Sequence, residues 1–146
     1  MLRGNYPATM DPKGRLKIPT AFKTFLDEHY GRDFFVTSFE GASVKVYPFA
    51  EWQKMEDKLA ALPSTDKHKK RFLDRVNYWG QMVQMDGQGR VLIPSLLRES
   101  AEMKGEVAVI GHLQHLEVWN MERFREHLER EPLTDEDLEA LSNFGI

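Results

Sequence analysis

The chain of 146 residues contains no cysteine, so it can form neither disulfides nor thiolate metal sites. No apolar run approaches the roughly 18 residues that a membrane-spanning helix requires. The first ten residues, MLRGNYPATM, lack the apolar stretch of a secretory signal peptide. These absences predict a cytoplasmic protein with no membrane role.

Catalytic and metal-binding motifs are also absent. The sequence contains neither the G-x-S-x-G elbow of serine hydrolases nor the G-x-x-x-x-G-K phosphate loop. Of the five histidines, only His112 and His115 are close together, in a predicted hairpin loop, which favours a surface role over a metal site. We therefore predict no enzyme, no bound metal, no cofactor and no small-molecule substrate.

The charge is small overall but unevenly distributed. Hydrophobic residues make up 41% of the chain and aromatic residues 11%, which is typical of a globular protein with one domain or two small ones. The formal net charge is −3, yet residues 1–23 have a net charge of +4 and residues 126–146 a net charge of −6. A basic N-terminal region and an acidic C-terminal region indicate separate roles for the two ends.

A ten-residue segment occurs twice. Residues 10–19 read MDPKGRLKIP, and residues 85–94, at an offset of 75, read MDGQGRVLIP. Further along, the offset becomes 72, so residues 5–62 recur, slightly shortened, as residues 76–130. The chain is therefore a tandem duplication.

The sequence pattern of each copy predicts the same order of strands and helices. A short strand (8–10; 81–85) leads through a turn to a second strand, and a helix follows Pro19 or Pro94 and stops at Gly31 or Gly105. A further strand pair and a helix complete each copy. The junction 63–75 predicts a linking helix whose basic cluster, Lys67, Lys69, Lys70 and Arg71, is typical of a solvated face.

The repeated turn has four structural residues. Asp11 and Asp86 open the turn, and Gly14 and Gly89 supply the left-handed backbone that closes a type I turn with a bulge. For a single D-x-x-G-R segment, hairpin formation is a sufficient explanation of these residues.

Hairpin formation does not explain Arg15 and Arg90, because neither the turn nor burial requires a guanidinium there. A rigid fork next to a tight turn suits phosphate oxygens or the O6/N7 edge of guanine. The structural alternative is an internal Asp–Arg ion pair, and the two roles can coexist. We predict that Arg15 and Arg90 contact double-stranded DNA, supported by Arg3, Lys13 and Lys17.

With a D-x-x-x-R motif at Asp11–Arg15 and again at Asp86–Arg90, the sequence resembles the MraZ family of bacterial transcriptional regulators. The resemblance extends through KGR-x-x-IP, QGRVLIP, YPFAEWQKMEDKLAALP and RFLDRV, and departs from the family pattern at Lys23, where arginine is more usual. It implies an α+β fold of tandem swapped-hairpin (AbrB-like) β-barrel domains with flanking helices. The implied SpoVT-AbrB-type domains are residues 5–47, with a helix to about 62, and residues 76–119, with a helix to about 130, followed by an acidic tail, 131–146.

The resemblance further implies a nucleoid-associated repressor of the division and cell wall operon. Such a protein would bind promoter-proximal direct repeats as a ring-like homo-oligomer. The alternative is an antitoxin-like protein-interaction module that engages another protein through the acidic tail.

Overall fold

The computed structural model describes residues 1–146 and contains six helices and eight strands. In chain order they are β1 (Asn5–Thr9), β2 (Arg15–Lys17), α1 (Thr20–His29), β3 (Asp33–Thr37), β4 (Val44–Pro48), α2 (Phe49–Ala60), α3 (Lys67–Trp79), β5 (Gln81–Gln84), β6 (Arg90–Leu92), α4 (Ser95–Ser100), β7 (Glu106–His112), β8 (His115–Asn120), α5 (Met121–Arg130) and α6 (Asp135–Ser142).

The strands form two antiparallel sheets. One has six strands in the order β1-β7-β8-β4-β3-β5, and the other consists of β2 and β6. Strands of the first sequence copy pair with strands of the second in both sheets, through β1–β7, β8–β4, β3–β5 and β2–β6. The mixture of helices and antiparallel strands confirms the coarse fold class. The tandem closed barrels are not confirmed, because the strands form these two sheets rather than a closed barrel, and the division into two domains stays a prediction.

The helices begin either after a proline or after a side chain that caps the first turn. Three of them follow a proline at the N-cap position, Pro19, Pro48 or Pro94. α3 and α5 start at Asp66 and Asn120, whose side chains accept hydrogen bonds from backbone N–H groups in the first turn. Local sequence is therefore sufficient to fix where these helices start.

The ends of several elements differ from the sequence expectation. α1 stops at His29 rather than at Gly31, and α4 is a short helix that ends at Ser100. β1 begins at Asn5 because all five of its residues pair with β7, and Pro7 is accommodated there because β1 is an edge strand. Long-range pairing, which the local pattern does not contain, sets the limits of β1.

The main core lies between the six-stranded sheet, the β2–β6 pair and helices α1 and α4. Its 19 buried residues include Leu16, Leu26, Val91 and Leu97. A smaller cluster on the other face of the sheet joins Trp52 of α2 and Val76 of α3 to residues of β3 and β4. The six-stranded sheet thus has packed residues on both faces.

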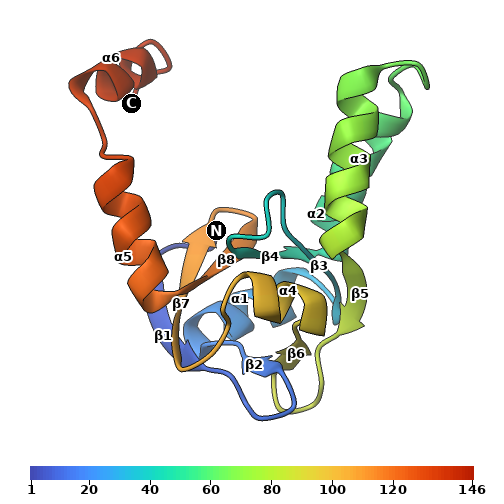
Figure 1. Cartoon of the computed structure of the whole chain (residues 1–146), viewed down its shortest axis with the longest axis vertical. Coiled ribbons are helices and arrows are strands. Elements are labelled where there is room, and N and C mark those ends of the chain that lie inside the picture. The colour runs from blue at the N-terminus through green and yellow to red at the C-terminus, as the bar shows by residue number, and fades with distance from the viewer.

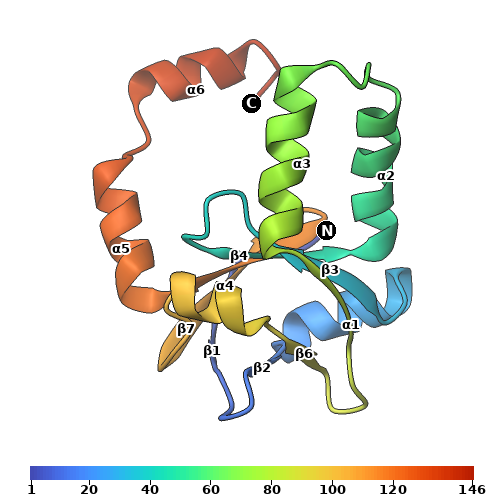
Figure 2. The ribbon, with the colours of Figure 1, turned by 45° about the vertical axis from the view of Figure 1, so that its right-hand side comes forward.

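The two faces of the sheet lead to different parts of the molecule. Helices α2, α3 and α5 extend from one face, whereas β2, β6 and the turns that precede them lie beyond the other, with α1 and α4 between (Figures 1 and 2). None of the six helices combines the length and the apolar composition that a membrane span requires. The repeated turns are therefore at one end of the molecule, away from the helical arms.

Candidate nucleic-acid interface

The first repeated turn joins β1 to β2 and is closed by backbone hydrogen bonds. The N–H of Gly14 donates to the carbonyl of Asp11 at 3.0 Å, and the N–H of Asp11 donates to the carbonyl of Arg15 at 2.9 Å. Gly14 has φ of 83°, in the left-handed region that favours glycine. This is the bulged turn geometry that the sequence pattern predicts.

The carboxylate of Asp11 organises this turn. Oδ1 accepts from the backbone N–H of Lys13 at 2.9 Å and of Arg15 at 2.8 Å, and Oδ2 accepts from Nε of Arg15 at 2.8 Å. The backbone hydrogen bond from Arg15, followed by that residue's side chain and charge, lowers the pKa of Asp11 below its ordinary value. The arginine is therefore held in one orientation by its own turn.

The second turn, between β5 and β6, repeats this arrangement. Asp86 Oδ1 accepts from the backbone N–H of Gln88 and of Arg90, both at 2.9 Å, and Oδ2 accepts from Nε of Arg90 at 2.8 Å. Gly89 has φ of 76°. The backbone hydrogen bond from Arg90 is the largest of the interactions that lower the pKa of Asp86. Sequence duplication has thus produced duplicated geometry.

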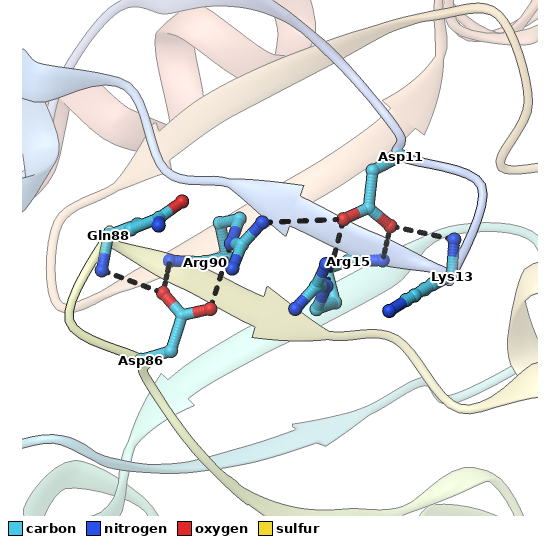
Figure 3. Close-up of polar contacts among 6 residues, drawn as sticks. All are labelled: Asp11, Lys13, Arg15, Asp86, Gln88 and Arg90. Atoms are coloured by element: carbon cyan, nitrogen blue, oxygen red, sulfur yellow. Dashed lines mark hydrogen bonds and ion pairs between the residues drawn. The ribbon is translucent and has the colours of Figure 1, made fainter.

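The β2–β6 pairing brings the two turns together, although 75 residues separate them along the chain. Lys17 pairs with Arg90 in register, and Arg15 pairs with Leu92. Nη1 of Arg90 also lies 3.9 Å from Oδ2 of Asp11, so each arginine is near the carboxylate of the first turn (Figure 3). The two D-x-x-x-R motifs form one continuous site.

The two faces of this short ladder differ in chemistry. Leu16 and Val91 point into the core and are completely buried. On the other face the arginine side chains are 30% (Arg15) and 25% (Arg90) exposed, beside the exposed Lys17. We call Lys13, Arg15, Lys17 and Arg90 the arginine ladder. The terminal amino groups of Arg15 and Arg90 donate no hydrogen bond within the chain, and only Nη1 of Arg90 is within ion-pair distance of Asp11, so they can donate to an outside acceptor.

Two further cations lie against the turns, and each comes from the opposite copy. The side chain of Arg98, in α4, fills the space next to Gly14, and that of Lys23, in α1, fills the space next to Gly89. Nε of Arg98 is buried without a hydrogen-bond partner in the chain. The sequence pattern did not predict that these two residues lie against the turns, although they face each other in the alignment of the copies.

Arg3 is not part of this cluster. It is exposed and precedes β1, whereas the turn follows the other end of that strand. Its neighbour Leu2 forms a bridge with Leu113 at the β7–β8 hairpin. The structure therefore brings together four of the five residues predicted to contact DNA and leaves Arg3 apart; its role as a contact stays a prediction.

The arrangement suits anion binding better than catalysis. It offers two pre-oriented guanidinium groups and two lysines on a narrow two-stranded ribbon. Its only acidic members, Asp11 and Asp86, are already engaged by backbone N–H groups and arginines. Guanidinium groups of this kind form bidentate hydrogen bonds with phosphates and with guanine.

Comparison with known proteins places the chain in a family. The family model described as "MraZ protein, putative antitoxin-like" matches residues 1–75 and 80–144. The chain belongs to the MraZ family. It is 53% identical to the transcriptional regulator MraZ of Acidobacterium capsulatum and 51% identical to that of Koribacter versatilis, with both chains of each pair covered in full. The protein of the same name from Pediococcus pentosaceus is 35% identical, again over the full length of both chains.

The resemblance drawn from the two D-x-x-x-R motifs is thereby confirmed. The names of these relatives denote transcriptional regulators, which are not a class of enzyme.

Proposed function

We propose that this protein is a sequence-specific DNA-binding transcriptional regulator that contacts DNA through the arginine ladder. The observation that supports this most directly is the β2–β6 pairing, which brings Arg15 and Arg90 from two distant turns onto one face of one ribbon, diagonal to each other in the register. Transcriptional regulator is also the name of its full-length relatives.

The ladder has a shape that DNA accommodates. The major groove of B-DNA admits a two-stranded β-ribbon, and the commonest specific contact is a bidentate one from arginine to guanine. Because Nε of each arginine is bound to its own aspartate, the guanidinium groups are held in one orientation and would lose little entropy on binding an acceptor. Lys13 and Lys17 add phosphate contacts, which contribute affinity without sequence preference.

The charge distribution supports the same orientation on DNA. The net charge of −3 would by itself repel a polyanion. The acidic C-terminal segment, however, lies with α5 and α6 on the side of the sheet away from the ladder (Figures 1 and 2). DNA at the ladder therefore meets the basic residues first.

One chain offers few contacts, so assembly is part of the proposal. Several copies joined in a ring would bind successive direct repeats at high effective concentration, which converts weak contacts into a tight complex. The resemblance to the MraZ family supports the finer points: repression of the division and cell wall operon, promoter-proximal direct repeats, and a cytoplasmic, nucleoid-associated protein.

A protein-interaction module is the second candidate. The C-terminal segment exposes five large apolar side chains, Leu133, Leu138, Leu141, Phe144 and Ile146. Exposed apolar residues of this number are typical of a surface that meets another protein. This role would be compatible with DNA binding but would not explain the duplicated arginines.

A gel-shift assay with the DNA upstream of the protein's own gene tests the proposal. The proposal predicts a discrete shift at a lower protein concentration than for a coding duplex of equal length and base composition. It also predicts that Lys58→Ala, in α2 on the other side of the sheet, binds as the unaltered protein does. Equal binding of both duplexes would contradict sequence-specific recognition, and no binding to either would favour the protein-interaction module.

A further inference from the structure

The β7–β8 hairpin places three metal-ligating side chains on one face of the sheet. His112 and His115 are directly opposite each other in the strand register, at the two ends of a two-residue loop. Glu117 lies two residues further along β8, so its side chain projects from the same face as that of His115. Sequence spacing identified only the two imidazoles; strand pairing adds the carboxylate.

The ligand atoms of these residues are close together. One nitrogen of each histidine and one carboxylate oxygen of Glu117 all lie within 4.8 Å of one another. Nε2 of His112 is 3.7 Å from Oε2 of Glu117, and the two imidazole rings are 5.4 Å apart. Ligands of one tetrahedral zinc ion are about 3.3 Å apart, so small side-chain rotations would complete the geometry.

Neighbouring residues orient two of the three side chains. The indole Nε1 of Trp119 donates to Oε1 of Glu117 at 2.7 Å, which fixes the carboxylate with Oε2 toward His112. The ring of His115 stacks on Tyr47, with centroids 4.4 Å apart. Nε2 of His115 is buried and has no hydrogen-bond partner in the chain. Metal sites commonly use neighbouring side chains, as Trp119 and Tyr47 are placed here, to orient the residues that bind the ion.

We propose that His112, His115 and Glu117 bind a divalent transition metal ion, with zinc the best match. Two imidazoles and one carboxylate form a known zinc ligand set, and such a set leaves a fourth position for water or another ligand. Imidazole ligands favour zinc, copper and nickel over magnesium or calcium, which prefer oxygen.

Lys45 sets the strength of this site. Its Nζ lies 2.9 Å from Oε2 of Glu117, so a metal ion must displace this ammonium group or share the carboxylate with it. The same Nζ lies over the ring of Phe39, 4.7 Å from its centroid, which offers it an alternative position. We therefore expect micromolar rather than nanomolar affinity.

Isothermal titration calorimetry of the full, tag-free chain with zinc chloride tests the proposal, with magnesium chloride as the non-binding control. The expected result is one zinc ion per chain and no heat from magnesium. His112→Ala should weaken binding by more than the about 10- to 100-fold that loss of an orienting partner costs. The exposed His112 is the safest residue to change, and His68→Ala, on the exposed start of α3, is the matched control that should bind zinc normally.

The position of the ion is tested by nuclear magnetic resonance. Zinc should shift the indole N–H signal of Trp119, which is bonded to Glu117, and leave those of Trp52 and Trp79 in place. No zinc binding at millimolar concentration would overturn the proposal. Equal affinity in a folded His112→Ala, Glu117→Gln variant would also overturn it, because the ion would then bind elsewhere.

Discussion

The first turn with the strand that follows it, residues 11–17, and the second turn with its strand, residues 86–92, have the same backbone but different charge. Both have an aspartate that accepts three hydrogen bonds, a glycine with positive φ and an arginine bound through Nε. Lys13 and Lys17 in the first turn correspond to Gln88 and Leu92 in the second. The shared residues build the turn and supply the arginine, and the differing residues set how much positive charge surrounds it.

Spatial pairing reduces this difference. Lys17 lies opposite Arg90, and Leu92 lies opposite Arg15, so the lysine of the first copy is the neighbour of the second copy's arginine. Neighbours in sequence are thus a poor guide to neighbours on the ladder. The remaining difference in charge between the two turns is chiefly that of Lys13 and Gln88. Substitutions at these positions can increase or remove it.

The largest expected effect is on DNA binding by single arginine variants. Arg15→Ala and Arg90→Ala should each lose about 1–3 kcal/mol of binding free energy for every guanine contact, multiplied over the chains that touch DNA. The loss should be somewhat greater for Arg15, whose turn also has Lys13. Fluorescence anisotropy with a labelled operator measures both. If Arg90→Ala binds as tightly as the unaltered protein, the second turn is architectural only.

The next largest expected effect is the loss of stability when either turn glycine is substituted. Gly14→Val and Gly89→Val should each cost about 1–3 kcal/mol of unfolding free energy, because a β-branched residue resists positive φ. We expect Gly14→Val to be worse, since its side chain meets the guanidinium of Arg98, whereas Gly89→Val meets the flexible chain of Lys23. Urea unfolding measures the difference. Equal losses would show that the flanking cations move freely.

Exchanging the charge at position 13 with that at position 88 should have a smaller effect, on the salt dependence of DNA binding. Lys13→Gln should weaken binding to all sequences alike and flatten the dependence of log K on log salt by about 0.9 for each phosphate that the lysine no longer neutralises. Gln88→Lys should steepen it by a similar amount, and the double variant should restore the original slope if the turns are equivalent. Unchanged slopes in both single variants would place neither position near phosphate.

The smallest expected effect is on the stability of the fold at low pH. Since the folded-state pKa of both Asp11 and Asp86 is lowered, their charge stabilises the fold above the ordinary aspartate pKa of about 4. This contribution is lost as the pH falls through the folded-state values. Asp11→Asn with Asp86→Asn should therefore flatten the stability profile below pH about 4. Carboxyl resonances of the two residues that titrate at the ordinary value would contradict this.

Local chemistry explains what the sequence could predict. The turn residues Asp11 and Gly14, and the start of α1 after Pro19, depend on contacts within a few residues, which a sequence displays directly. Side chains alternate along a strand, so the burial of Leu16 next to the outward-facing Arg15 follows from the same local rule.

Features that depend on pairing between distant segments could not be predicted from the sequence. That β2 pairs with β6, so that both arginines share one ribbon, depends on register between segments far apart in the chain. The same is true of Glu117, which joins two histidines only through the β7–β8 register and the hydrogen bond from Trp119. Arg3 shows the converse, because it is near the turn in sequence but lies at the far end of β1.

The most direct test of the central claim is DNA binding by the Arg15→Ala, Arg90→Ala double variant, compared with the Lys58→Ala control. Partly exposed ion pairs contribute about 0–1 kcal/mol to stability, so the double variant should fold and assemble as the unaltered protein does. We predict that its specific binding to the operator is abolished, while Lys58→Ala retains it. A folded, correctly assembled double variant with unaltered operator affinity would contradict DNA recognition by the ladder and leave the arginines as partners of Asp11 and Asp86 alone.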